Sequence, residues 1–243
     1  YTRKGRTEMK LNSKRTILVG LAFLSICAFW QMYDSIVPLI LTKTFHMNET
    51  FSGAIMAADN ILALFLLPFF GSVSDKSHTK IGKRMPFILF GTGCAIILMN
   101  ILPLLDNSYA AQPSGFKTAS FVIVLGLLLV AMGTYRAPAV ALMPDVTPKP
   151  LRSRANAIIN LMGAVGGILY LGVAAVLYPN SKTAGLDHVN YQPLFIVVSA
   201  IMFVAVAVLF LTIREPKLTA ENQALEKQHP EWNLAQDDGS GHE

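Results

Sequence analysis

The sequence predicts an all-α membrane protein with six transmembrane helices, and three observations lead to this prediction. Hydrophobic residues make up 53% of the 243 residues and charged residues only 14%, a charged share about half that of a typical soluble domain. Six stretches are each apolar over about 20 residues, the length needed to cross a hydrocarbon core of about 30 Å. Nearly all lysines and arginines fall outside those stretches. Lipid is therefore the expected solvent, because a chain this short could not bury so much apolar surface in water.

The expected elements follow one another with short connections. Residues 1–15 form a basic cytoplasmic N-terminus, residues 16–213 a six-helix transmembrane bundle, and residues 214–243 a polar cytoplasmic linker or tail. The six expected spans are 16–41, 51–73, 85–105, 119–143, 155–178 and 193–213. The connections are rich in Gly, Pro, Asn and Ser, which is typical of turns at the membrane interface. The first span is too long for a signal peptide, and five more spans follow it.

The basic residues predict the orientation of the bundle. Of the 20 lysines and arginines, sixteen lie on one side of the expected spans, three on the other, and Arg136 lies inside a span. Because cytoplasmic loops are enriched in Lys and Arg, both termini are expected in the cytoplasm, with the protein in the plasma (inner) membrane. The net charge of +5 follows from this topology, so nucleic acid is not an expected partner; the lipid bilayer is.

Three charged side chains are expected inside the membrane: Asp34, Asp59 and Arg136. At a rise of about 1.5 Å per residue, Asp59 lies about 5 Å to the outer side of mid-span, where Asp34 also lies, and Arg136 lies about 8 Å to the inner side. Such residues are costly in lipid and usually face a cavity or a partner. Asp59 is a candidate ion-coupling carboxylate, although it could simply bond locally to Asn60. Arg136 must hold a carboxylate, a carbonyl or a substrate, since it stays charged.

Two polar stripes provide candidate substrate contacts. On the first span, Asp34 and Gln31 share one helical face, with Trp30 beside them, so all three could contact a substrate. The alternative is that these polar side chains only hold neighbouring helices together. On the fifth span, Asn160 lies in a stripe with Gly163 and Gly167. Close helix packing is the favoured interpretation of that stripe, and substrate contact by its asparagines is the alternative. No nucleophile–base pair, P-loop or zinc motif accompanies them, so neither an enzyme nor a cofactor is expected.

The connection over residues 71–86 carries the most specific pattern in the chain: Gly71, then Asp75, then Gly82 followed directly by the basic Lys83 and Arg84. It resembles the cytoplasmic signature of the major facilitator superfamily, in the longer form of the glycoside–pentoside–hexuronide symporters and the sucrose-transporter-like branch. A second stretch, residues 135–156, is similar to another pattern of the same branch. The resemblance implies conformational ion pairs at a cytoplasmic gate, involving Gly71, Asp75, Gly82, Lys83, Arg84, Arg136, Asp145, Arg152 and Arg154.

The resemblance also implies the fold and function of the whole. Transporters of this superfamily have twelve helices in two six-helix halves around a midplane site, and this chain corresponds to the N-terminal half. A C-terminal six-helix half, in cis or in trans, is the expected partner, and the chain is expected to be a fragment that does not transport alone. The implied function is proton- or sodium-coupled sugar symport. Efflux or metabolite transport on the same fold and a non-transporting truncated product are the alternatives.

Overall fold

The computed structural model describes residues 11–183, 185–186, 188–230 and 232. Over these residues the chain consists of helices and short connections, with no strand. Six of the helical stretches are long and apolar enough to cross a membrane. The predicted all-α bundle of six spans is therefore confirmed.

Each span is a long helix. The six are α1 (Ser13–Leu39), α2 (Glu49–Lys76), α3 (Met85–Ala111), α4 (Gly115–Val146), α5 (Arg152–Leu177) and α7 (Gln192–Thr212). The π-helical turn η1 (Ile40–Thr44) extends α1, and the 3-10 turn η2 (Lys149–Leu151) precedes α5. Two further helices, α6 (Asn180–Thr183) and α8 (Glu215–Gln228), lie outside the spans. Several helices run past the expected ends, most notably α3, which continues from residue 105 to Ala111.

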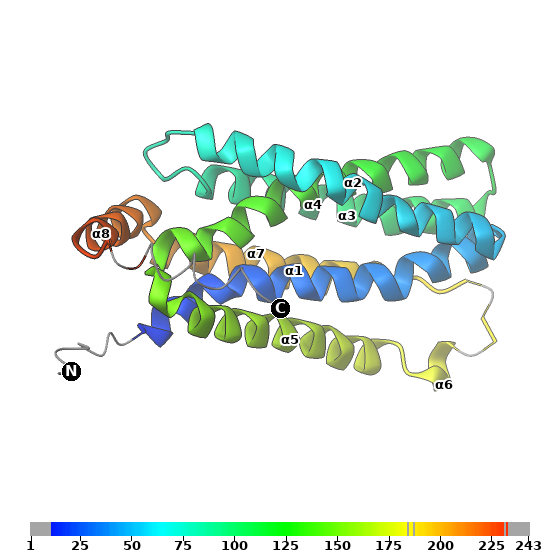
Figure 1. Cartoon of the computed structure of the whole chain (residues 1–243). Helices are drawn as coiled ribbons and strands as arrows, with labels where there is room; N and C mark the ends of the chain where they lie inside the picture. The colour runs from blue at the N-terminus through cyan, green and yellow to red at the C-terminus, as the bar shows by residue number, and fades with distance from the viewer. Residues whose placement is uncertain (1–10, 184, 187, 231, 233–243) are drawn as a thin grey trace, which may run out of the picture.

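Helix α1 packs against α5 and α7, α3 packs against α4 and α7, and α2 packs mainly against α4 (Figure 1). The core lies where these helices meet, around the fully buried Phe29, Met99 and Phe195. Helix α2 is the most exposed of the six spans, and large apolar side chains such as Phe65 and Phe69 project from it. Its outer face is therefore suited to lipid or to another apolar protein surface.

Two glycines of α5 allow a close approach to α1. A Cβ at Gly166 would overlap the carbonyl of Leu24, and one at Gly163 would lie 2.9 Å from the sulfur of Cys27. Gly167, which the sequence pairs with Gly163, has more room, since its Cβ would lie 3.8 Å from the Gln31 side chain. Close packing thus rests on glycines three residues apart, which share one helix face.

The bundle has two distinct ends. At one, here called the basic end, lie the connections 77–84 and 147–151 and the helix α8, which crosses the ends of the spans (Figure 1). At the other, here called the far end, lie η1, the end of α3 and α6. Charged side chains gather at the basic end and in a pocket in the middle of the bundle, and a buried carboxylate, Asp106, lies at the far end.

Candidate functional site: a central pocket and an ion-pair network at the basic end

The central pocket lies between α1, α2 and α4. Trp30 comes from α1, Asp59 from α2 and Arg136 from α4, and mostly aliphatic side chains fill the rest of the wall: Leu62, Ala63, Leu66, Leu67, Leu129 and, as a bare backbone, Gly133. The cavity volume is about 20 Å³. A space of this size holds about one water molecule and no sugar.

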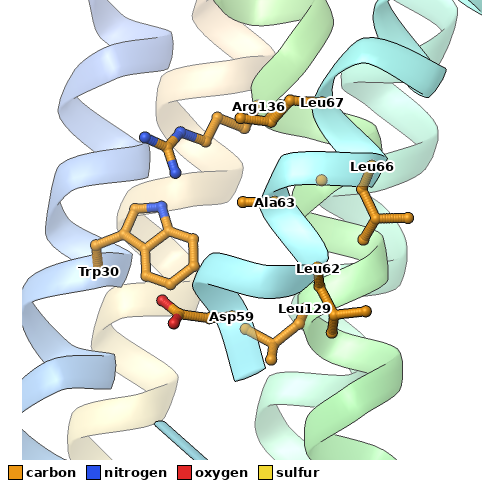
Figure 2. Close-up of a pocket in the computed structure, with 9 residues that line it drawn as sticks. Trp30, Asp59, Leu62, Ala63, Leu66, Leu67, Leu129 and Arg136 are labelled. Atoms are coloured by element: carbon orange, nitrogen blue, oxygen red, sulfur yellow. The ribbon is translucent and has the colours of Figure 1, made fainter. Parts of the chain in front are cut away.

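Trp30 separates the two charges of the pocket. The guanidinium carbon of Arg136 lies 5.6 Å from the centre of the indole, within the range of a cation–π interaction. Figure 2 shows the indole between the Arg136 guanidinium and the Asp59 carboxylate. The ring of Tyr33 lies edge-on to the indole, with ring centres 5.3 Å apart. The buried indole Nε1 has no hydrogen-bond acceptor among the described residues, so it can still donate a hydrogen bond.

The Asp59 carboxylate is held on one side only. Its Oδ1 accepts hydrogen bonds from the backbone N–H of Asn60 at 2.6 Å and from the Asn60 amide at 2.9 Å. The local bonding that the sequence allowed therefore exists. Its Oδ2 has no protein donor within the part of the chain that the structure describes. That oxygen can take a proton, a metal cation or a substrate hydroxyl.

The other expected substrate residues lie outside this pocket. Asp34 is exposed on α1, Asn160 is exposed on α5, and Gln31 is half-buried between these helices beside Gly167. The structure thus brings Trp30 together with Asp59 and Arg136, and leaves the remaining three on the surface formed by α1 and α5.

Arg136 is not part of the basic-end ion pairs, and the structure corrects that expectation. Helix α4 continues from Arg136 to Val146, so the side chain starts about 15 Å from the helix end. At that depth the guanidinium reaches Trp30 and not the carboxylates at the basic end.

The basic end is organised around Arg84, whose side chain is 5% exposed. Its Nε donates to Asp145 Oδ2 at 2.9 Å, and one terminal nitrogen donates to the Ser74 hydroxyl at 2.6 Å and the Gly71 carbonyl at 3.4 Å. The other terminal nitrogen pairs with Asp75. The nitrogens of one guanidinium therefore join the end of α2 to the end of α4. Such charge-assisted hydrogen bonds are the strong ones in proteins.

Lys83 completes this group of charges. Its amine lies 3.1 Å from Asp145 Oδ2 and 3.8 Å from Asp75 Oδ1. The structure therefore brings most of the residues named in the connection 71–86 together with Asp145 of the stretch 135–156.

Gly82, just before Lys83, has a φ of 121°, and a side chain there would overlap the carboxylate of Glu215. Glycine is required at this turn for both reasons.

Glu215, which the sequence analysis did not single out, is the acceptor for the start of α3. Its carboxylate accepts hydrogen bonds from the backbone N–H groups of Lys83 at 2.9 Å, Arg84 at 2.9 and 3.1 Å, and Met85 at 2.8 Å. The residue is 1% exposed. The first N–H groups of a helix lack partners within it, and the helix dipole favours an anion there. Helix α8 is therefore docked on the bundle and is not merely a linker.

The last carbonyls of α4 are satisfied by side chains from three other helices. Arg15 donates to Val146 at 3.1 Å, Asn222 to Asp145 at 3.1 Å, and Arg152 to Pro144 at 2.9 Å. Arg152 also pairs with Glu226 at 3.0 Å. The final carbonyls of a helix have no partner within it. These contacts therefore fix α1, α5 and α8 to the end of α4.

Arg154 stands apart from this network, contrary to expectation. It is exposed on α5, and neither an ion pair nor a hydrogen bond joins its side chain to another described residue. Arg154 lies two positions after Arg152, about 200° around the helix, so the two guanidinium groups project from different faces.

The far end holds a buried carboxylate that the sequence analysis also missed. Asp106 is fully buried, with no hydrogen-bond donor among the described residues, and its Oδ2 lies 3.9 Å from His188 Nδ1. His188 lies 3.2 Å from the Thr44 hydroxyl and 2.9 Å from the Asn107 amide oxygen. This cluster ties the end of α1 and the end of α3 to the connection before α7.

Six helices long and apolar enough to span a membrane, with opposite charges around a central pocket, define a polytopic membrane protein. The chain belongs to the Major Facilitator Superfamily, whose family model matches residues 19–235. This superfamily is a family of membrane transporters built from two six-helix halves. The 243 residues and six spans fit the N-terminal half of the superfamily fold.

Three relatives show the range of similarity. Sucrose transport protein SUC3 of Arabidopsis thaliana is 34% identical over 158 residues, which are 60% of this chain and 26% of the relative. Sucrose transport protein SUT3 of Oryza sativa subsp. indica is 34% identical over 180 residues, 68% of this chain and 35% of the relative. Solute carrier family 45 member 3 of Homo sapiens is 25% identical over 186 residues, 75% and 34% respectively.

These relatives confirm the resemblance to the sucrose-transporter-like branch. The chain spans between 26% and 35% of the length of these curated relatives.

Proposed function

We propose that this chain is the N-terminal half of a cation-coupled sugar transporter, with a proton or a sodium ion as the coupling ion. The observation that carries the proposal is the pocket in which Asp59 and Arg136 flank Trp30, in a chain that belongs to the Major Facilitator Superfamily. The proposal that the substrate is a sugar is supported by the relatives named sucrose transport proteins.

Asp59 is the proposed coupling residue. One carboxylate oxygen is occupied by Asn60 and the other lacks a protein donor among the described residues. Arg136, the nearby cation, is directed to the indole, so Asp59 is free to gain and lose a cation during transport. A pocket of about 20 Å³ suits a proton or a small ion, because ligands as large as sugars need cavities of about 300 Å³ or more.

The sugar site is proposed on the surface that carries Gln31 and Asp34 of α1 and Asn160 of α5, and Trp30, next to Gln31 in the sequence, links this surface to the central pocket. Asp34 and Asn160 are exposed, and an uncovered polar group in lipid costs of order a kcal/mol or more. A complementary six-helix half would cover this surface and form the second wall of the site, as alternating access between two bundles requires. A second copy of this chain is disfavoured, because it would add carboxylates and no basic residue at that depth.

The basic end is proposed to face the cytoplasm, in keeping with the distribution of lysines and arginines. Single cysteines in place of Lys80 and Glu221 should react with an impermeant reagent from the cytoplasmic side alone, and a cysteine in place of Ser114 from the outside alone. Labelling at position 80 from outside would reverse the orientation.

The test of function is uptake into proteoliposomes by this chain assembled with its complementary half. Labelled disaccharide should accumulate under an imposed proton or sodium gradient, and the gradient that drives it identifies the coupling ion. Asp59→Asn should abolish accumulation while leaving some exchange, whereas the control Glu49→Gln, at the exposed start of α2, should accumulate normally.

Three results would overturn parts of this proposal. Saturable uptake by the chain alone would remove the need for a second half. Unchanged accumulation by Asp59→Asn would remove Asp59 from coupling. Transport of other solutes in place of any sugar would favour the efflux or metabolite carrier.

A further inference from the structure

A second pocket lies at the basic end, apart from the central site. It is formed by the connection before α3, the end of α7 and the start of α8, and its cavity volume is about 370 Å³. Its walls are apolar and basic: Ile81, Met85, Phe210, Ile213 and Pro216, with Lys80, Arg214 and Lys217. It therefore joins two kinds of surface, one suited to hydrocarbon and one suited to an anion.

The charge around this pocket is positive. None of its lining residues is acidic. The adjacent Glu215 is buried and committed to the N–H groups at the start of α3. Lys217 has an exposed partner, Glu221, at 3.9 Å one turn along α8, while Lys80 and Arg214 form no ion pair with any described residue. Two cations thus remain fully available to a ligand, and the third is held weakly.

The pocket lies at the boundary of the membrane. The sixth span ends at Thr212, one residue before the buried Ile213 and two before Arg214. Phe210 is 39% exposed and Leu211 is 78% exposed, so exposed apolar side chains occupy the last turn of α7, just before Arg214. Arginine and lysine with apolar stems are well suited to this depth, where the head reaches the polar layer.

We propose that this pocket binds the phosphate headgroup of an anionic phospholipid, from the leaflet that meets the basic end. Lys80, Arg214 and Lys217 contact the phosphate, and one acyl chain lies along Phe210 and Leu211. Basic pockets on the cytoplasmic side of transmembrane helices are suited to anionic headgroups in this way. The apolar wall distinguishes a lipid from a free phosphate, because inorganic phosphate gains nothing from Phe210 or Ile213.

The position of the lipid gives it a structural consequence. Lys80 belongs to the connection between α2 and α3, whereas Arg214 and Lys217 belong to the junction of α7 and α8. A bound phosphate therefore joins the same two segments that Glu215 joins from the inside. Lipid binding should tighten the docking of α8 on α3.

The experiment measures lipid binding to the full chain, purified in a neutral detergent, by native mass spectrometry. Long-chain phosphatidylglycerol is titrated against phosphatidylcholine, and inorganic phosphate and a short-chain phosphatidylglycerol are added as separate competitors. The test variant is Lys80→Gln/Arg214→Gln/Lys217→Gln. The matched control is Lys14→Gln/Lys76→Gln/Lys227→Gln, which removes equal charge from exposed positions on the same end.

The expected result is tighter binding of phosphatidylglycerol than of phosphatidylcholine, and binding roughly 100-fold weaker in the test variant, at about 1 kcal/mol per basic residue. The control variant should lose less than about threefold. Equal losses in both variants would reduce the effect to general attraction and overturn the site, and so would equal binding of phosphatidylcholine.

Two further measurements separate the remaining outcomes. Displacement of the lipid by inorganic phosphate as effectively as by short-chain phosphatidylglycerol would show an anion site and refute the lipid. If the triple variant fails to fold, Lys80→Gln and Lys217→Gln are tested singly, since each should weaken binding about fivefold. The proposal does not depend on transport or on the sugar, so these tests are independent of the proposed function.

Discussion

The basic end and the central pocket both hold charged side chains, but these side chains have different numbers of hydrogen-bond and ion-pair partners. At the basic end the buried Arg84 meets two carboxylates, a hydroxyl and a carbonyl. In the central pocket Arg136 meets one aromatic ring, and Asp59 leaves one oxygen without a protein donor among the described residues. Buried charges are stable when they are paired and hydrogen-bonded. The first region is therefore complete within this chain, whereas the second retains binding capacity.

This difference separates stability from function. A network whose partners all come from one chain holds its helices together, and removing one member should unfold or loosen that end. A pocket whose polar groups have spare bonding capacity contributes little to stability and can bind an ion or a substrate. Mutations in the two regions should therefore differ most in their effect on the free energy of unfolding.

The largest expected effect is that of Arg84→Gln. Removing the guanidinium leaves Asp75 and Asp145 beside each other with Lys83 as their remaining cation. Breaking a buried ion pair lowers the free energy of unfolding by about 3–5 kcal/mol, and we expect the lower part of this range because the Asp75 side chain is 55% exposed. Equilibrium unfolding in mixed micelles measures this change. The control is Lys83→Gln, which removes a more exposed amine and should cost about 1 kcal/mol or less. Equal effects of the two substitutions would contradict the central role of Arg84.

The next largest effect is expected from Glu215→Gln. Glutamine keeps one acceptor oxygen and loses the charge, so some of the N–H groups of Lys83, Arg84 and Met85 lose their partner. A hydrogen bond to a charged group contributes about 1.5–3 kcal/mol, and we expect a loss of about 2 kcal/mol. Faster amide hydrogen exchange at residues 83–85 would locate the effect. The control Glu226→Gln disrupts a half-exposed pair with Arg152 and should leave that exchange unchanged.

The sequence predicted the six spans and much of the basic end because these depend on local patterns. Apolar length predicts a span wherever the chain must cross lipid. The ordered Asp, Gly and basic residues of 71–86 lie close in sequence, so a short connection is enough to bring Asp75 to Arg84. The contact of Arg136 with Trp30 could not be predicted in the same way, because it depends on how α1 and α4, which are distant in sequence, pack beside each other.

Glu215 and Asp106 were missed for a related reason. Both lie just beyond an apolar stretch, where hydropathy no longer predicts structure. A signal did exist for each. Glu215 precedes Pro216 and stands in the first turn of α8, a helix-start pattern. Asp106 continues the spacing of the buried Met99 and Leu102 on α3, at intervals of three and four residues. What each contacts still depends on helices distant in sequence.

A smaller effect is expected for the contact between Arg136 and Trp30. A double-mutant cycle with Arg136→Gln and Trp30→Leu should give a coupling energy of about 1 kcal/mol, the size of a partly desolvated cation–π interaction. The control cycle pairs Arg136→Gln with Phe29→Leu, whose ring packs against Trp30 on the same helix, and should give a coupling within about 0.5 kcal/mol of zero. A coupling as large as the loss at Arg84 would remove the distinction between the two regions.

The smallest effect is expected at Arg154, and it tests what a charge needs in order to stabilise the basic end. Arg152 and Arg154 lie on one helix, but Arg152 donates to the carbonyls of Pro144 and Thr147 at 2.9 and 3.2 Å and pairs with Glu226. Arg154 is exposed and bonds to none of the described residues. Arg154→Gln should therefore change the free energy of unfolding by less than about 0.5 kcal/mol, as exposed substitutions usually do. Arg152→Gln should cost about 1 kcal/mol, because it frees carbonyls at the end of α4. The two variants carry the same chemical change two residues apart, so unfolding both in the same micelles isolates the contribution of the partners. A loss at Arg154 that matches or exceeds the loss at Arg152 would mean that the amount of positive charge, and not its fixed acceptors, stabilises this end.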